Sequence, residues 1–334
     1  MKVRYLFIIL LIGIASCDSS EPKKVTAVEI TENPLEVLTK KISADSSDAS
    51  LFHERSRIYL FENQIENSLA DINRALQLNG KEPLFFLTLA EIYLHMGQTD
   101  GCNLALQKAA ELDPANSIPY FRLAELNLLL KDYTTAMMYA DRSLAVNVVN
   151  PDAHFAKGLI FLAKQDTANA IREFQFSLDQ SEDFIEPMLQ LGIIYTNQRN
   201  PLAEAYLNKA IKTYPDLHKA RYQLALYLQD NNQVENAMKH YDTLLMQVPE
   251  NKFVLFNLGY LHLVYLNQAE EAVKFFDEVL IQDPTYVDAL YNKGRALEEL
   301  GHYLNAREVY TEVLRREENH ALSIEALNRL DRRR

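Results

Sequence analysis

The sequence predicts an all-α solenoid, built from eight copies of one helical hairpin and closed by a single capping helix. Three observations support this prediction: a period of about 34 residues, small residues at two fixed positions of each copy, and proline where a copy ends. A fixed period of this kind is typical of repeat proteins, in which each unit buries its apolar face only against its neighbours. Such scaffolds usually bind other molecules rather than transform them.

The repeats begin where the chain aligns on itself, with starts 33–35 residues apart. The eight repeats are therefore expected at residues 49–82, 83–116, 117–150, 151–184, 185–217, 218–251, 252–286 and 287–320. One residue fewer near Pro201 and one more near Asn267 account for the unequal spacing, because loops between helices accommodate such changes cheaply. Residues 321–334 repeat the first-helix pattern and then stop, so we expect a capping helix with a basic tail.

Small residues recur at positions 8 and 20 of the repeats, one position in each helix of the hairpin. Position 8 is Ala or Gly in every repeat but the first, which has Ser56, and position 20 is Ala, Ser or Cys throughout. Small side chains let two helix backbones approach where larger ones would hold them apart. Large residues at positions 4, 7, 11 and 24 recur at helical spacing and are expected to fill the hairpin core. Proline ends the second helix in four repeats, at Pro114, Pro215, Pro249 and Pro284.

These residues at fixed positions resemble the tetratricopeptide repeat (TPR) family, and the matching stretch is residues 49–320. The resemblance implies a right-handed superhelix of antiparallel helix-turn-helix units. It also implies that a protein or peptide partner binds in a concave groove lined by the first helix of each repeat, at positions 2, 5, 9, 12 and 13. Position 9 holds no Asn in any repeat, which disfavours the carboxylate clamp of the chaperone-type members.

Apolar and aromatic residues gather at these groove positions, most of all in repeat seven. An apolar helical or extended peptide is the expected ligand, since buried aromatic side chains usually dominate such interfaces. Glu125 and Arg295 are expected to set its register. The alternative is that neighbouring repeats or a dimer mate already cover these side chains. The candidate groove residues are Phe121, Leu128, Phe155, Leu159, Tyr222, Phe253, Phe256, Tyr260, Leu263, Tyr291 and Arg295.

The N-terminus reads as a secretory signal over residues 1–16, with Lys2 and Arg4 before an apolar run that is too short for a stable membrane span. The run ends Ile14-Ala15-Ser16-Cys17, which resembles the lipobox of bacterial lipoproteins. That resemblance implies that Cys17 is lipidated and anchors the chain to a membrane of the bacterial cell envelope, such as the outer membrane. The alternatives are cleavage by an ordinary signal peptidase and retention of the apolar run as a weak anchor.

A polar segment, residues 17–48, is expected to tether the repeats to the lipid, with one short helix over residues 34–42 capped by Asn33. The net charge of −12 makes nucleic acid an unsuitable partner, because phosphate neutralisation dominates that kind of binding. Cys102, the second of only two cysteines, occupies position 20 and is expected to be a small buried residue rather than a reactive thiol.

No catalytic, metal-binding or cofactor-binding motif accompanies the repeats. The eight histidines form no pair at a zinc-binding spacing, and neither a glycine-rich phosphate loop nor a Gly-x-Ser-x-Gly elbow occurs. We therefore expect a non-enzymatic, membrane-anchored adaptor, resembling the TPR lipoproteins that assemble secretion, pilus, polysaccharide or cell-wall machinery. The alternative is a self-associating structural protein of the envelope, whose groove is filled by its own dimer mate.

Overall fold

The computed structural model describes residues 33–332, and within that range every regular element is an α-helix. The signal segment, Cys17 and the first half of the tether, residues 17–32, lie outside the described residues. In chain order the helices are α1 (Pro34–Ala44), α2 (Ala49–Phe61), α3 (Ile65–Leu78), α4 (Pro83–His95), α5 (Thr99–Leu112), α6 (Ser117–Leu129), α7 (Tyr133–Val146), α8 (Pro151–Ala163), α9 (Thr167–Gln180), α10 (Ile185–Asn197), α11 (Leu202–Thr213), α12 (His218–Asp230), α13 (Val234–Gln247), α14 (Lys252–Val264), α15 (Ala269–Gln282), α16 (Val287–Glu299), α17 (Tyr303–Arg316) and α18 (Ala321–Asp331).

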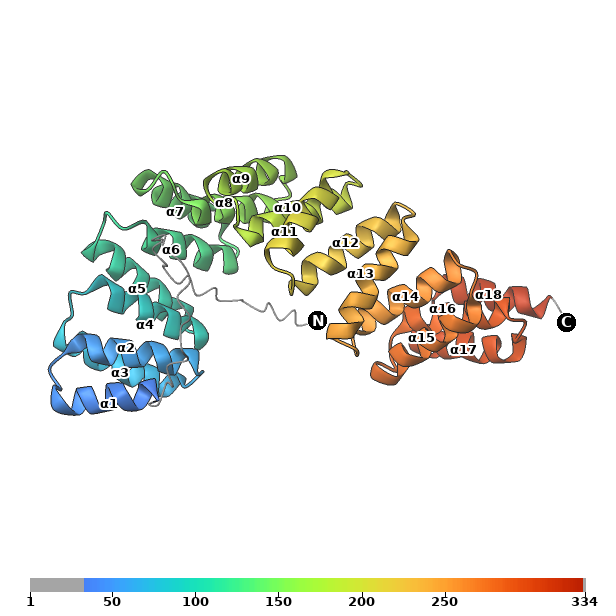
Figure 1. The fold of residues 1–334 in the computed structure, drawn as a ribbon, viewed down its shortest axis with the longest axis horizontal. Helices are drawn as coiled ribbons and strands as arrows, with labels where there is room; N and C mark the ends of the chain where they lie inside the picture. The colour runs from blue at the N-terminus through green and yellow to red at the C-terminus, as the bar shows by residue number, and fades with distance from the viewer. Residues whose placement is uncertain (1–32, 333–334) are drawn as a thin grey trace, which may run out of the picture. The chain divides into compact units, whose positions relative to one another are not determined.

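The helices alternate as the first and second members of successive hairpins (Figure 1). The first helices α2, α4, α6, α8, α10, α12, α14 and α16 begin at the residues where the repeat starts were expected. Within hairpins, α6 packs on α7, α8 on α9, α10 on α11, α12 on α13, α14 on α15 and α16 on α17. The prediction of an all-α solenoid of helical hairpins is confirmed. None of the helices in the described range is long and apolar enough to cross a membrane.

Each hairpin turns through one residue in the left-handed region of backbone space. The residue lies at position 15, or at position 16 in the repeat with one extra residue, and only two of the eight are glycines. In repeat one, the backbone N–H of the next residue, Gln64, donates to the carbonyl of Tyr59 at 2.7 Å, which satisfies a carbonyl at the end of the helix. The left-handed residues are Asn63, Gly97, Lys131, Gln165, Arg199, Asn232, Asn267 and Gly301.

The small residues at position 8 permit the close helix contact expected of them. A Cβ added to Gly158 would lie 2.3 Å from Cε1 of Phe174, and one added to Gly294 would lie 2.6 Å from Cε1 of Tyr310. Both aromatic rings belong to the second helix of the same hairpin and are fully buried. The ring at position 24 therefore fills the space that the missing side chain at position 8 leaves.

The described residues fall into two compact units, 33–92 and 93–332, which divide within α4. In the first unit α1 packs on α2 and buries Leu38 and Ile42, so these residues belong to the folded part rather than to the tether. His53 is also buried here and its ring lies 2.9 Å from Oγ1 of Thr88. At the end of the second unit, α18 packs on α17 through Ala326 and Leu330, as a capping helix does.

Candidate functional site

The candidate groove lies in the second unit, on the first helices α6, α8, α10, α12, α14 and α16. These helices contact one another across repeats, α6 with α8, α10 with α12 and α14 with α16, so equivalent positions share one face. We call the side chains at positions 2, 5, 9, 12 and 13 of these helices the groove face. At about 100° per residue, position 12 lies about 80° around the helix from core position 4, position 5 about 100° and position 13 about 180°.

The exposure of the side chains follows this order around the helix. At position 13 all six side chains are exposed, at position 9 all six are half-buried, and at position 12 three of the six are buried. The most exposed large apolar side chains of the face are therefore at positions 2 and 13. They are Ile118 at 49%, Phe253 at 53%, Leu129 at 44% and Val264 at 37% exposure.

The structure contradicts the assignment of Leu263 to the groove surface. Leu263 is only 1% exposed and belongs to the same buried cluster as Leu255 and Ala269. Leu263 occupies position 12, which is near enough to position 4 on the helix to face the interior, and Ala269 begins the next helix beside it. It is a core residue and offers no surface to a partner.

The aromatic residues at position 5 are half-buried because two neighbouring rings enclose them. Phe155 lies 5.7 Å from Phe174 of its own hairpin and 5.4 Å from Phe184, the residue that precedes the next first helix. The same arrangement recurs around Phe256 with Phe276 and Tyr286, at 5.8 and 5.3 Å. Much of each position 5 ring is thus used to join consecutive repeats, which answers in part whether neighbouring repeats cover these side chains.

A third position 5 ring, Tyr291, lies between Tyr310 at 5.9 Å and His320 at 5.1 Å. The residue before each first helix, which supplies Phe184, Tyr286 and His320, was not singled out from the sequence. Its signal is present, however, as a large ring at the last position of three repeats.

The groove face of α6, α8 and α10 forms what we call the acidic half. Its fifteen positions contain three carboxylates, Glu125, Asp152 and Glu186, and no Lys or Arg. Its apolar members include Phe121, Leu128, Phe155 and Leu159, all half-buried.

Burial raises the pKa of each of these three carboxyl groups above its ordinary value. The charge of Asp152 raises the pKa of both Glu125 and Glu186 further, so Asp152 is close enough to each of them for repulsion. Arg122, from position 6, opposes this effect at Glu125, to which it donates a hydrogen bond of 2.7 Å. Oε2 of Glu186 is buried and accepts no hydrogen bond.

The groove face of α12, α14 and α16 forms what we call the aromatic half. Its ring-bearing residues are Tyr222, Phe253, Phe256, Tyr260 and Tyr291. In contrast to the acidic half, it also carries two cations, Lys219 and Arg295.

Polar contacts in the aromatic half are largely satisfied within the chain. The amide of Asn257 donates to the hydroxyl of Tyr222 at 3.1 Å, and the guanidinium of Arg295 donates to the amide oxygen of Asn292 at 2.9 Å. Next to the face, Lys252 pairs with Asp283 at 2.8 Å. This contact, with two hydrogen bonds from Thr285, lowers the pKa of Asp283 to about 2.

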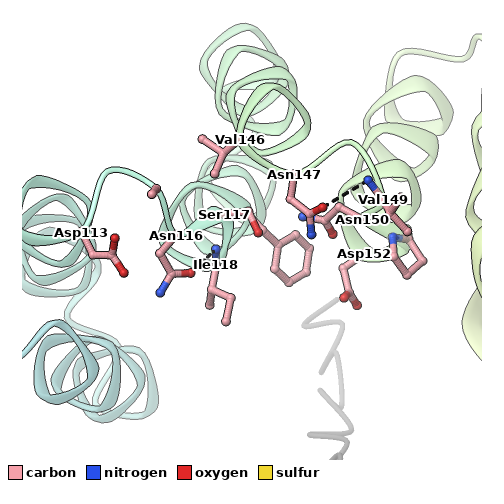
Figure 2. A pocket seen from close by; sticks show the side chains of 12 residues that line it. Asp113, Asn116, Ser117, Ile118, Val146, Asn147, Val149, Asn150 and Asp152 are labelled. Atoms are coloured by element: carbon pink, nitrogen blue, oxygen red, sulfur yellow. Dashed lines mark hydrogen bonds between the residues drawn. The ribbon is translucent and has the colours of Figure 1, made fainter.

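A cavity of about 680 Å³ opens beside the acidic half, between two of the turns that join repeats (Figure 2). Figure 2 shows Asn116 from one turn with Ile118 at the start of α6, and Asn147 and Val149 from the next turn with Asp152 at the start of α8. Ile118, Phe121 and Asp152 are members of the groove face, so the cavity is continuous with it. None of the residues that line the cavity is Lys, Arg or His.

Among the described residues no three His, Cys, Asp or Glu side chains come together as metal ligands would. Cys102 is buried, as expected, and burial raises its pKa to about 11. A thiol with so high a pKa carries little thiolate at neutral pH and is a poor nucleophile. Cys17, the expected lipidation site, lies outside the described residues.

Comparison with known proteins agrees with this architecture. Two family models, both described as tetratricopeptide repeat, match residues 188–217 and residues 222–286 and 260–321. No curated protein sequence matches this chain.

Three solved structures are similar in fold. PilW, described as a widely conserved type IV pilus biogenesis factor, is 18% identical with a TM-score of 0.55, over 63% of this chain and 98% of PilW. A tetratricopeptide repeat protein from Parabacteroides merdae is 13% identical with a TM-score of 0.52, over 74% of this chain and 98% of that one. The Cut9-Hcn1 structure is 15% identical with a TM-score of 0.53, over 89% of this chain and 58% of that one. At these identities the similarity concerns the fold alone.

Proposed function

The chain belongs to the tetratricopeptide repeat proteins, and from this premise we propose that it is a membrane-anchored scaffold whose groove face binds a segment of a protein partner. The observation that carries the proposal is two pairs of exposed apolar side chains at positions 2 and 13, one pair on α6 and one on α14. These side chains are Ile118, Leu129, Phe253 and Val264. Proteins seldom expose such a surface without a partner.

The cell envelope is the proposed site of action, and assembly of an envelope machine is the proposed process. The support is the N-terminal sequence, in which the apolar run ends in a lipobox-like segment at Cys17. A lipid chain would hold an acidic protein at a membrane that its own charge does not attract. PilW shares the fold and is described as a pilus biogenesis factor, which is compatible with this proposal.

The membrane anchor is tested by Cys17→Ser. We expect the full-length variant either to leave the membrane fraction or to remain as an unprocessed precursor that migrates more slowly. Palmitate labelling of the wild-type chain, lost in the variant, would identify the modification. A variant that fractionates and migrates as the wild type does would exclude lipidation at Cys17.

Partner binding is tested by crosslinking and capture from membranes with the Phe253→Ala/Tyr260→Ala double variant. Both side chains are on the groove face, and Phe253 is more than half exposed, so truncation should reduce capture while helical content stays the same. A matched control is Ile281→Ala on α15, where the side chain is 79% exposed but lies on a second helix. Equal loss with Ile281→Ala, or no loss with the double variant, would move the binding site off the groove face.

A self-associating envelope protein remains the second candidate, because a second copy would cover the same exposed side chains. Size-exclusion chromatography with light scattering on residues 33–334 separates the two. A monomer supports the adaptor. A dimer that the Phe253→Ala/Tyr260→Ala variant dissociates supports self-association.

A further inference from the structure

The acidic half of the groove differs from an ordinary apolar docking surface in its charge. Its three carboxylates share one face with no Lys or Arg among the fifteen groove positions of α6, α8 and α10. Arg122, just outside the face, is more than half exposed and pairs with Glu125. The next two carboxylates along the face are Asp152 and Glu186, at position 2 of consecutive repeats.

Glu186 is half-buried, and one of its two carboxylate oxygens has no hydrogen-bond partner. Its Oε2 is buried and accepts no hydrogen bond from the chain. A buried polar atom without a partner costs on the order of 1–3 kcal/mol, and more when the group is charged. Burial and the negative charge of Asp152 both raise the pKa of Glu186, because both disfavour its charged form. A cation beside Glu186 and Asp152 would offset it.

The cavity next to Asp152 has a mixed wall, with apolar side chains beside asparagine and aspartate side chains. Ile118, Phe121 and Val149 contribute to its wall, and its volume of about 680 Å³ is ample for one large aliphatic or aromatic side chain. Asp152 and Asp113 are the ionisable residues of that wall, and no Lys, Arg or His lines the cavity. Arg122, outside the cavity, lowers the pKa of Asp152 but does not offset the effect of burial. The cavity and the carboxylates together are complementary to a ligand that has an apolar side chain next to a positively charged one.

We propose that the acidic half binds a basic peptide segment, in which a Lys or Arg lies between Asp152 and Glu186 and an adjacent apolar side chain enters the cavity beside Ile118. This rests on the proposed function and specifies its partner. The opposite chemistry is unfavourable, because an acidic segment would add like charge to a face whose carboxylates already repel one another. The aromatic half holds four carboxylates at its groove positions, but it also holds the cations Lys219 and Arg295, and one of the four, Glu298, pairs with Arg329 at 2.7 Å. A basic segment would therefore meet positive charge there, which it does not meet on the acidic half.

The test is selection from a random dodecapeptide phage library on immobilised residues 33–334, at low and at physiological salt. We expect enriched peptides to carry Lys or Arg next to Leu, Ile or Phe, and to lack Asp and Glu. Selection on the Asp152→Asn/Glu186→Gln double variant should lose that preference. The matched control is Asp288→Asn, which removes a carboxylate at the same repeat position in the aromatic half and should leave the preference intact.

The affinity of one enriched peptide for the wild type and the variants measures how much the two carboxylates contribute to binding. Fluorescence anisotropy should show a loss of at least about tenfold with the double variant, and the loss should shrink as salt rises, because salt screens exposed charges. Charge reversal by Glu186→Lys should weaken binding of the basic peptide. It should strengthen binding of a version of that peptide with Glu in place of Lys. Melting curves and circular dichroism establish that each variant is folded.

The outcomes separate this inference from the proposed function. Enriched peptides without positive charge, or basic peptides whose affinity survives the double variant, would overturn the basic-segment proposal and leave peptide binding in place. Absence of any enrichment above the uncoated surface would overturn both.

Discussion

The acidic and aromatic halves of the groove share one backbone plan and differ in chemistry. In both, an aromatic ring at position 5 is packed between a buried ring of its own hairpin and the residue before the next first helix. In both, position 13 is exposed. The acidic half has three carboxylates and no cation on its face, whereas the face of the aromatic half combines carboxylates with the cations Lys219 and Arg295. Tyr222 and Arg295 are also hydrogen-bonded within the chain.

This difference shows where a repeat protein can vary its binding surface. Position 5 is tied to the junction between repeats, so changing it changes the fold as well as the surface. Positions 2, 9 and 13 are less constrained by packing. The two halves differ in the side chains that they carry at these positions. The unpaired Glu186 is a local cost to stability that a purely structural surface would not need, as often holds at binding sites.

The largest expected effect concerns position 12, where Leu263 of the aromatic half is buried and Leu128 of the acidic half is half-buried. Leu263→Ala should lower the free energy of unfolding by about 2–5 kcal/mol, because it leaves a cavity at a side chain that is 1% exposed. The equivalent change in the acidic half, Leu128→Ala, should cost about 1 kcal/mol, because that side chain is already half-exposed. Urea unfolding followed by circular dichroism measures both. Equal losses of unfolding free energy would mean that Leu263 and Leu128 are equally buried.

A second comparison concerns the close contact between the two helices of a hairpin. An added Cβ would lie 2.3 Å from Cε1 of Phe174 at Gly158 in the acidic half, but 2.8 Å from Cε1 of Phe276 at Gly259 in the aromatic half. Gly158→Ala should therefore be the more destabilising, by about 1–3 kcal/mol from overpacking against a ring that cannot move away. Thermal unfolding of both variants checks the order. A more stable Gly158→Ala would indicate that helix propensity outweighs the contact.

The smallest effects concern charge, and they should have opposite signs in the two halves. The pKa of Glu186 is raised in the folded state, so its ionisation disfavours folding at neutral pH. Glu186→Gln should raise the melting temperature at pH 7 by on the order of 1 °C. That gain should vanish as the pH falls through the raised pKa towards 4.5, the ordinary value.

Asp283 gives the opposite case, because its pKa is lowered to about 2. Its charge stabilises the fold above about pH 3.8, and this contribution is lost as the pH falls towards 2. Asp283→Asn should therefore lower the melting temperature at pH 7. Melting curves of the two variants at pH 7 and pH 4 test the pair, and effects of the same sign would show that both carboxylates sit in similar surroundings.

Local patterns made most of the fold predictable. The starts of all the first helices and the small residues of the hairpin contact are visible in the sequence, because each depends on residues within one repeat. The candidate groove residues could also be named from their positions within the repeat. Their exposure could not be predicted, since it depends on what packs over them from the neighbouring repeat.

By itself, then, the sequence determined the repeat and its helices, because helical periodicity and small-residue positions are short-range properties. The tertiary structure decided three further features. It buried Leu263 beside Ala269, enclosed Phe155 and Phe256 between rings from elsewhere in the chain, and docked Leu38 of α1 onto the first hairpin. It also brought Asp152 near Glu186, 34 residues along the chain, where burial and mutual repulsion give that face its preference for positive charge. Each of these depends on contacts between residues far apart in the chain, and no local pattern encodes the distance between them.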